Sequence, residues 1–395
     1  MLSHRNIGEN VFEVAKHLDL ENGHKRVISY LPICHIFERS ASYYSLQIGS
    51  EIHFAEGLDT LGDNIREVQP HFMAVVPRLL EKVFDTIVDK GSTLTGLKKR
   101  LFFWALNLGE RYKPYGENGW WYEWQLSIAN ALVFKKWREA LGNHLEFMLA
   151  GSAPMQDRLV KVFTAAQIPI FEGYGLTETS PAISVSGFKN KRFKIGTVGK
   201  ILDHLNVKIA ADGEILVKGS NVMLGYYKNE ALTRQTIVDG FLHTGDIGEL
   251  DTEGFLKITD RKKEIFKTSG GKYIAPTVIE AALKKSRFIE QAMVIGEGEK
   301  MPAALIQLHQ DFIYEWAKRH NHTIVNITTD QRLRKRIQKE VDTANVHFGK
   351  WEQIKTFEIT NDEWTVVAGH LTPTLKMKRK IILEKYQDLY KKIYN

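Results

Sequence analysis

The chain has 395 residues, of which 43% are hydrophobic and 26% are charged. This composition excludes a largely disordered protein, and the length predicts two domains, one of which is larger than the other. The formal charge is +7 and the pI is near 9.1. Such an excess suits anionic small molecules, a membrane surface or nucleic acid. Because the sequence contains no recognisable nucleic-acid-binding module, we expect small anionic ligands and no nucleic acid.

Cys34 is the only cysteine, which excludes an internal disulfide and a cysteine-rich metal site. A reducing, cytoplasmic compartment is therefore expected, with Cys34 as a small buried residue. No uninterrupted apolar run approaches the roughly 18 to 20 residues that span a bilayer. Any membrane contact is thus expected to be peripheral, at the inner face of a membrane.

The first part of the chain has the pattern of an α/β domain. After Pro77, apolar residues recur at helical spacing, namely Leu79, Leu80, Val83, Phe84, Ile87 and Val88. Residues 145–150 and 168–171 are short and apolar, as buried strands are, and residues 155–166 predict a helix between them. Both strands run into loops that contain glycine. In open α/β sheets, ligands bind at the carboxyl ends of the strands, so both loops are candidates for one site.

Aromatic side chains are dense between Trp104 and Trp137, where Trp120, Trp121 and Trp124 are nearly consecutive. A lipid-contacting surface is one interpretation of this region. Packing around a large core is the commoner cause of such density, so the sequence favours ordinary helix packing.

The loop after the second strand carries side chains suited to a nucleotide. Gly173 and Gly175 are expected to form a turn in which a ligand approaches the main chain. Tyr174 offers a flat ring to a base, and Thr177 offers a hydroxyl to phosphate. Glu178 offers a carboxylate to Mg²⁺, which prefers oxygen ligands. A glycine turn followed by a helix cap is the alternative interpretation.

A β-rich region and a second domain are expected next. Short strands with closely spaced turns are predicted for residues 194–256. Residues 260–272 combine charge with paired glycines, which predicts an interdomain hinge. Helices are then expected at 276–284, 311–320 and 331–346, and strands at 291–296 and 303–308. We predict a large α/β domain over residues 1–260 and a small mobile α+β domain over residues 261–395.

Three further segments carry chemistry in a recognisable order. Asp246 follows a glycine turn and suits ribose hydroxyls, Arg261 suits a second ribose contact, and residues 371–379 form a lysine-rich loop. Together with residues 31–39 (Leu-Pro-Ile-Cys-His-Ile-Phe-Glu-Arg) and 174–181, this order resembles the adenylate-forming superfamily. Within it, the chain is most similar to the long-chain fatty acid–CoA ligases, over essentially its whole length.

The resemblance implies two steps in one cleft. A fatty carboxylate attacks the α-phosphate of Mg-ATP, which gives acyl-adenylate and pyrophosphate. The thiol of coenzyme A then attacks the acyl carbonyl and releases AMP. A lysine and a metal neutralise phosphoryl charge in the first step, and the small domain rotates before the second.

The resemblance also implies the roles of individual residues. Lys376 is the expected adenylation lysine, with Lys378 as the alternative, and Glu178 is the magnesium ligand. The catalytic set is Lys376, Thr177, Glu178 and His35. The nucleotide-binding set is Ser152, Ala153, Pro154, Glu172, Gly173, Tyr174, Gly175, Thr177, Asp246, Arg261 and Lys376. The segment that faces coenzyme A contains Ser269, Gly270 and Lys272, and the hinge residue is Lys263.

Two histidines near these segments, His35 and His243, also have structural interpretations. His35 lies near the acyl carboxylate according to the resemblance, whereas a lone histidine beside Pro32 and Phe37 is commonly a structural residue. His243, three residues before Asp246, is expected to be a packing or turn residue.

The sequence departs from the family pattern in one respect. A phosphate loop made of Ser, Thr and Gly and ending in Pro-Lys-Gly does not occur, and Met1 to Asn6 resemble the segment that follows this loop in relatives. We therefore expect a chain cut after the loop, with impaired adenylation and a need for a complementing N-terminal segment. The alternatives are a fatty acyl-AMP ligase and a catalytically dead protein that binds a nucleotide or acyl-CoA.

Overall fold

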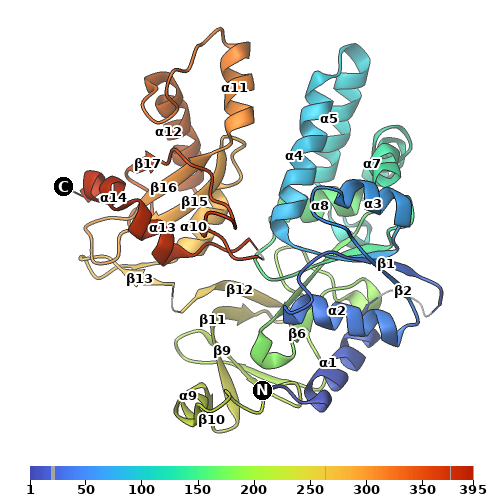
Figure 1. Cartoon of the computed structure of the whole chain (residues 1–395). Helices are drawn as coiled ribbons and strands as arrows, with labels where there is room; N and C mark the ends of the chain where they lie inside the picture. The colour runs from blue at the N-terminus through green and yellow to red at the C-terminus, as the bar shows by residue number, and fades with distance from the viewer. Residues whose placement is uncertain (19–22, 263, 374, 395) are drawn as a thin grey trace. The chain divides into compact units, whose positions relative to one another are not determined.

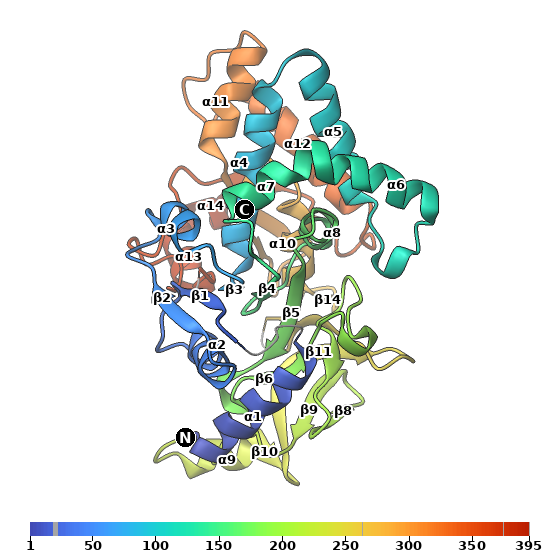
Figure 2. The ribbon, with the colours of Figure 1, turned by 90° about the vertical axis from the view of Figure 1, so that its right-hand side faces the viewer.

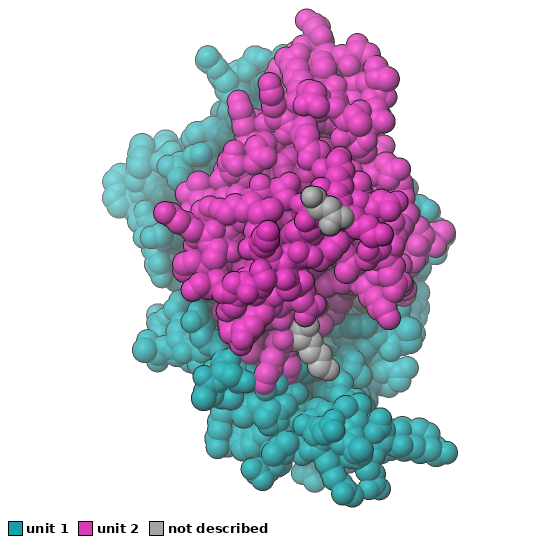
Figure 3. Space-filling view, turned by 90° about the vertical axis from the view of Figure 1, so that its left-hand side faces the viewer, with its two compact units in different colours: residues 1–244, 248–258 teal, residues 245–247, 259–395 magenta. Residues whose placement is uncertain are grey.

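A computed structural model describes residues 1–18, 23–262, 264–373 and 375–394, and Figures 1 and 2 show its ribbon from two directions. The chain forms two compact units, which Figure 3 distinguishes by colour. Unit 1 contains residues 1–244 and 248–258, and unit 2 contains residues 245–247 and 259–395. The predicted domains, 1–260 and 261–395, stay a prediction, and the predicted hinge residue Lys263 lies outside the described residues.

A seven-stranded sheet forms the centre of unit 1, in the order β2-β1-β3-β4-β5-β6-β7. The first five strands are parallel, and β6 and β7 are antiparallel to their neighbours. The strands are β1 (Arg26–Ser29), β2 (Glu51–Phe54), β3 (Phe72–Val75), β4 (Phe147–Ala150), β5 (Ile170–Gly175), β6 (Ala182–Val185) and β7 (Lys200–Ile201). Every residue of β3 and β4 is buried, as expected for the centre of a parallel sheet.

Helices accompany this sheet, and local sequence explains where several of them start. Ser3 forms a capping box with Asn6 at the start of the first helix, and Pro77 lies in the first turn of α4. Leu80, Phe84 and Val88 form the buried stripe of α4. The helices are α1 (His4–His17), α2 (Ile36–Gln47), α3 (Leu61–Val68), α4 (Pro77–Thr93), α5 (Gly96–Glu110), α6 (Trp120–Ala129), α7 (Lys135–Ala140) and α8 (Asp157–Ala165).

A second, smaller sheet confirms the predicted β-rich region. Its strands follow the order β10-β11-β9-β8, and β12 pairs with β11. The elements are β8 (Asn206–Ile209), β9 (Glu214–Lys218), α9 (Glu230–Thr236), β10 (Ile237–Val238), β11 (Phe241–Leu250) and β12 (Leu256–Arg261).

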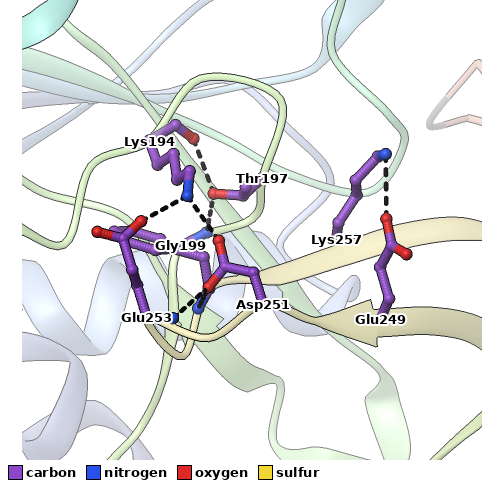
Figure 4. Close-up of polar contacts among 8 residues, drawn as sticks. Lys194, Thr197, Gly199, Glu249, Asp251, Glu253 and Lys257 are labelled. Atoms are coloured by element: carbon purple, nitrogen blue, oxygen red, sulfur yellow. Dashed lines mark hydrogen bonds and ion pairs between the residues drawn. The ribbon is translucent and has the colours of Figure 1, made fainter.

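The turn between β11 and β12 is fixed by a charged network (Figure 4). Lys194 Nζ lies 2.7 Å from Asp251 and 2.6 Å from Glu253. Asp251 also accepts hydrogen bonds from the backbone N–H groups of Glu253 and Phe255. The strands that continue into unit 2 are therefore anchored at this turn within unit 1.

Unit 2 is an α+β unit with its own sheet. Strand β15 is antiparallel to β16, and β16 is parallel to β17. A separate hairpin is formed by β13 and β14. The elements are β13 (Phe266–Lys267), β14 (Tyr273–Ile274), α10 (Pro276–Leu283), β15 (Ile289–Ile295), β16 (Ala303–Leu308), α11 (Gln310–Arg319), α12 (Gln331–Asn345), β17 (Phe357–Ile359), α13 (Arg379–Lys385) and α14 (Gln387–Tyr394).

Two expectations about burial are wrong. Cys34 is exposed, because it lies in the loop between β1 and α2 rather than inside either element. Trp120, Trp121 and Trp124 are also exposed, although Trp137 in the same region is buried.

Within the part of the chain that the structure describes, no helix has the length and apolar character needed to cross a bilayer.

Candidate active site

The carboxyl ends of the parallel strands bring the unit 1 candidates to one edge of the sheet. The backbone N–H of Gly151, just after β4, donates to Val75 at the end of β3 over 3.3 Å. A Cβ on Gly151 would lie 3.0 Å from the Phe37 ring, so α2 packs directly on this loop. Ser40 Oγ lies 3.5 Å from the Ser180 carbonyl oxygen. The segments that carry His35, Ser152 and Glu178 are therefore neighbours.

The loop after β4 presents Ser152, Ala153 and Pro154. Ser152 has φ of 72°, a left-handed conformation that is uncommon for a residue with a side chain. Ala153 and Pro154 are exposed. This exposed loop suits the predicted position beneath a nucleotide base, which stays a prediction.

Glu172 lies on β5 beside this loop. Burial raises the pKa of its carboxyl group to about 8, the negative charge of Asp157 adds to the increase, and the Met155 N–H opposes it. Glu172 is therefore mostly protonated at neutral pH. A neutral carboxyl group can both donate and accept a hydrogen bond, which matches the mixture of donors and acceptors on the edge of a nucleotide base.

Gly173 and Gly175 do not form the predicted turn. Both belong to β5, which continues through Gly175, and neither has a positive φ. Glycine is needed at position 175 because the backbone of Pro181 approaches closely where the chain turns back toward β6. An added Cβ would lie 1.7 Å from the Pro181 carbonyl oxygen. Tyr174, between the two glycines, is half-buried against the small core of Ile183, Ile215, Val217 and Leu256.

Thr177 and Glu178 lie in one turn of 3₁₀-helix directly after β5. The Tyr226 hydroxyl donates to Glu178 Oε1 over 2.9 Å, and the Met223 N–H donates to the Glu178 carbonyl over 2.8 Å. Among the described residues, no group of three or more His, Cys, Asp or Glu side chains could form a complete metal cage. A single oriented carboxylate fits Mg²⁺, which commonly takes one or two carboxylates and completes its shell with phosphates and water.

His35 caps helix α2, where its Nδ1 accepts the Phe37 N–H over 3.3 Å. The structural interpretation of this histidine is therefore supported, and its predicted role near an acyl carboxylate stays a prediction. In the first turn of the same helix, Glu38 is buried and accepts a hydrogen bond from Ser29 Oγ. Burial raises the pKa of Glu38 to about 7.

Unit 2 brings Asp246, Arg261 and Lys376 together. Asp246 is only 4% exposed, and its Oδ1 lies 3.2 Å from Arg261 Nε. Burial lowers the pKa of the Lys376 ammonium group below its usual range, and the Arg261 cation adds to this decrease. The carboxylates of Asp246 and Glu264 act in the opposite direction. Lys376 is thus a partly desolvated cation beside the predicted ribose-binding pair.

A tight loop positions Lys376. The Lys376 N–H donates to Thr372 Oγ1 over 3.0 Å, and the Thr372 N–H donates back to the Lys376 carbonyl over 2.8 Å. Just beyond the loop, Arg379 donates to both carboxylate oxygens of Glu280 on α10, at 2.8 and 2.6 Å. The alternative lysine, Lys378, is exposed. The geometry therefore favours Lys376 over Lys378.

The predicted coenzyme A segment forms the tip of the β13–β14 hairpin in unit 2. The Thr268 N–H donates to the Lys272 carbonyl over 3.0 Å, and the Ser269 N–H donates to the Glu299 backbone carbonyl over 2.8 Å. Ser269, Gly270 and Lys272 are all exposed. Their exposure leaves them available to a ligand, and their role toward coenzyme A stays a prediction.

Three residues that support the site, Tyr226, Glu264 and Asp157, belong to none of the predicted motifs. Tyr226 orients Glu178 from 48 positions further along the chain. The Glu264 carboxylate opposes the decrease in the pKa of Lys376, and the Asp157 carboxylate adds to the increase in the pKa of Glu172. No spacing rule connects such distant partners, so only the fold could identify them.

Solved structures with the same fold are adenylate-forming proteins. The o-succinylbenzoate CoA synthetase MenE of Bacillus subtilis, in complex with its acyl-adenylate intermediate, aligns with a TM-score of 0.67 and 21% identity. The alignment covers 96% of this chain and 65% of that chain. The adenylation domain of a carboxylate reductase from Mycobacterium chelonae aligns with a TM-score of 0.73 and 19% identity, over 98% and 56% of the two chains. These neighbours confirm the predicted α/β adenylation fold with a smaller α+β part.

Sequence comparisons identify the family. The model of the AMP-binding enzyme family matches residues 1–227, and the model of the AMP-binding enzyme C-terminal domain matches residues 263–395. This chain belongs to the AMP-binding enzyme family, which confirms the resemblance to the adenylate-forming superfamily.

Curated relatives carry the name expected for the long-chain branch. The long-chain-fatty-acid–CoA ligase FadD15 of Mycobacterium tuberculosis is 34% identical over 388 residues, which cover 96% of this chain and 64% of that protein. Long chain acyl-CoA synthetase 3 of Arabidopsis thaliana is 32% identical over 97% of this chain and 61% of that protein. The chain thus spans less than two thirds of the length of these relatives.

Proposed function

We propose that this chain serves the ATP-dependent activation of a long-chain fatty acid and its transfer to coenzyme A, through an acyl-adenylate. The observation that carries the proposal is the half-buried Lys376 beside Asp246 and Arg261. The names of the relatives supply the substrate class, since they are long-chain fatty-acid–CoA ligases and acyl-CoA synthetases. The proposal includes a mobile small domain over residues 261–395 and the hairpin at Ser269 to Lys272 as the coenzyme A segment.

The unit 2 cluster suits the α-phosphate and ribose of a bound adenylate. Lys376 supplies a positive charge where phosphoryl oxygens gain negative charge, and partial burial strengthens that interaction because the local dielectric constant is low. Asp246 accepts hydrogen bonds from ribose hydroxyls, while Arg261 orients its carboxylate. Lys376 then neutralises charge during adenylation, the first half of the reaction.

The unit 1 cluster suits the base and the metal. Glu172 is mostly protonated at neutral pH and offers a hydrogen bond to an adenine ring, while Tyr174 offers its ring face. Glu178, oriented by Tyr226, would hold Mg²⁺, and this ion would neutralise phosphate charge. Thr177, exposed one residue before Glu178, offers its hydroxyl to phosphate.

The direct test supplies the chain with palmitoyl-adenylate and coenzyme A and measures palmitoyl-CoA and AMP by mass spectrometry. We expect both products to form. We also expect Asp246→Asn to weaken binding of palmitoyl-adenylate about 10- to 100-fold, because a buried charge-assisted contact to the ribose is lost. The control is Asp239→Asn, since Asp239 is an exposed turn residue. Equal binding by both variants contradicts the ribose role.

The role of Lys376 is tested by comparing the two half-reactions. We expect Lys376→Ala to lower palmitate-dependent pyrophosphate exchange about 100-fold while sparing thioester formation from supplied palmitoyl-adenylate. Lys378→Ala is the matched control, since Lys378 is exposed and two residues away. An equal loss of both half-reactions in Lys376→Ala overturns the assignment.

Two other outcomes separate the alternatives. Adenylation without thioester formation favours a fatty acyl-AMP ligase that uses a carrier protein. Binding of AMP or acyl-CoA with no turnover of palmitoyl-adenylate favours a catalytically dead binding protein.

A cytoplasmic location with peripheral membrane contact is part of the proposal. The single cysteine of the sequence supports the cytoplasmic location.

A further inference from the structure

Three tryptophans form a continuous exposed surface at the start of α6. Trp120, Trp121 and Trp124 are 79%, 56% and 53% exposed. The rings of Trp121 and Trp124 are stacked with centroids 5.0 Å apart, and those of Trp120 and Trp121 meet edge-on at 5.6 Å. Figure 2 shows α6 at the edge of unit 1, beyond α5. We call these three residues the tryptophan face.

The opposite side of α6 already has its packing partner. Tyr122, Leu126 and Ala129 are buried, and the Tyr122 hydroxyl donates to the Leu108 carbonyl of α5 over 2.7 Å. Seven of the ten residues of α6 are aromatic or aliphatic, so the helix is apolar on both sides. A helix that is apolar on all sides is normally buried on all sides. The tryptophan face is thus an exposed apolar surface with no packing partner among the described residues of unit 1 and is suited to a partner outside that unit.

The charge of the surrounding helices indicates what kind of partner fits. The segment from 96 to 140, which contains α5, α6 and α7, has eight Lys or Arg and four Glu residues. Its formal excess of four is more than half of the total of seven for the chain. Lys135 and Lys136 are exposed on α7, which continues the line of α6 through a π-helical stretch at Asn130–Phe134. An exposed aromatic cluster followed by exposed lysines along the same line of helix is complementary to an anionic surface.

We propose that the tryptophan face docks unit 1 onto the surface of an anionic lipid bilayer. Tryptophan rings favour the headgroup region of a bilayer, and nearby Lys and Arg side chains are attracted to anionic lipids. Leu132 is exposed between the tryptophans and the lysines, and it extends the apolar surface along the helix. In this pose α6 and α7 lie on the bilayer without crossing it.

The docking surface would place the proposed reaction at the source of its substrate. Long-chain fatty acids partition into bilayers because each buried CH₂ group contributes about 0.8 kcal/mol. The substrate link rests on the proposed function, whereas the docking itself does not. Vesicle binding is therefore measured without ATP, fatty acid or coenzyme A, so that a failure of the proposed reaction leaves its result unchanged.

The experiment measures sedimentation of the chain with vesicles of phosphatidylcholine, with and without phosphatidylserine. We expect binding to the mixed vesicles, and we expect Trp120→Ser/Trp121→Ser/Trp124→Ser to lower the partition coefficient about tenfold or more. Lys135→Glu/Lys136→Glu is expected to remove most of the dependence on phosphatidylserine. Phe12→Ser is the control, since Phe12 is an exposed aromatic residue on another helix.

Folding of the variants is checked by circular dichroism. If the triple variant is unfolded, Trp124→Ser alone and the double lysine variant carry the test. Equal vesicle binding by the parent chain and all folded variants overturns the proposal. A parent chain that binds neither kind of vesicle overturns it as well. A dimer that dissociates in the tryptophan variants in the absence of lipid also overturns it, because the face would then join two copies of the chain.

Discussion

At the scale of single residues, Glu38 is an unusual feature of the helix that follows the His35 loop. Its side chain is buried, and Ser29 Oγ donates to its Oε1 over 2.5 Å. Its other oxygen, Oε2, has no hydrogen-bond partner among the described residues. An ionised carboxylate with one unsatisfied oxygen is costly inside a protein. Burial accordingly raises the pKa of Glu38 to about 7 from its ordinary value of 4.5.

This pKa predicts a pH-dependent stability. Because the folded state binds the Glu38 proton more tightly than the unfolded state, the favourable contribution is full below pH 4.5 and is lost as pH rises through about 7. The shift corresponds to about 3 kcal/mol. We expect Glu38→Gln, which stays neutral, to stabilise unit 1 by about 1 to 3 kcal/mol at pH 8 and to give no gain at pH 4.

Urea unfolding of the parent chain and Glu38→Gln at these two pH values checks the prediction. Glu56→Gln is the control, since Glu56 is exposed on the loop after β2, and it should change stability by less than about 0.5 kcal/mol at either pH. The same difference between parent and Glu38→Gln at pH 4 and pH 8 contradicts the prediction.

At the scale of elements, strand β5 contains two glycines with different neighbours. A Cβ on Gly175 would lie 1.7 Å from the Pro181 carbonyl oxygen, a backbone atom that cannot rotate away. A Cβ on Gly173 would lie 3.5 Å from the Ser184 carbonyl oxygen, which is ordinary contact. A substitution by alanine therefore causes a severe overlap at Gly175 and only an ordinary contact at Gly173.

We expect Gly175→Ala to destabilise unit 1 by about 3 kcal/mol or more, since the overlap forces β5 away from Pro181. Gly173→Ala, the matched variant on the same strand, should cost less than about 1 kcal/mol. Thermal unfolding of both variants checks the prediction. Equal losses, or a small loss in Gly175→Ala, would show that Pro181 moves aside without cost.

The same strand shows what the sequence alone predicts. The start of α4 at Pro77 and the bounds of α12 and β16 agree with the predictions to within about one residue, because their sequence patterns are local to each segment. The end of β5 was predicted wrongly, because a glycine pair predicts a turn unless the cross-strand neighbour is known. The exposure of Trp120, Trp121 and Trp124 was missed for a similar reason: local density does not indicate which side of a helix is covered.

The candidate site also contains some residues that sequence motifs predict and others that only the structure reveals. Motif order selected Lys376, Asp246 and Arg261, and the fold brings these three residues together in unit 2. Their supporting residues, such as Tyr226 behind Glu178, are distant in sequence and belong to no motif. Motifs thus predicted the groups proposed to contact a ligand, whereas the groups that orient them required the structure.

At the scale of the whole molecule, each unit has its own hydrophobic core. The buried clusters of unit 1 lie between Val11 and Leu256, and those of unit 2 lie between Phe266 and Tyr386. Separate cores can unfold separately, since cooperative unfolding requires shared packing. We therefore predict two thermal transitions, each sensitive to variants of one unit only.

Arg379→Met provides the test for unit 2. It leaves the buried Glu280 carboxylate without its bidentate partner, and breaking a buried ion pair in this way costs about 3 to 5 kcal/mol. Lys380→Met is the matched control, since the Lys380 side chain is 90% exposed. In differential scanning calorimetry, Arg379→Met should lower one transition and Gly175→Ala the other, while Lys380→Met lowers neither. A single transition whose midpoint both variants lower equally would mean that the two cores unfold cooperatively. The parts of the chain before and after residue 260 would then not be independent folding units.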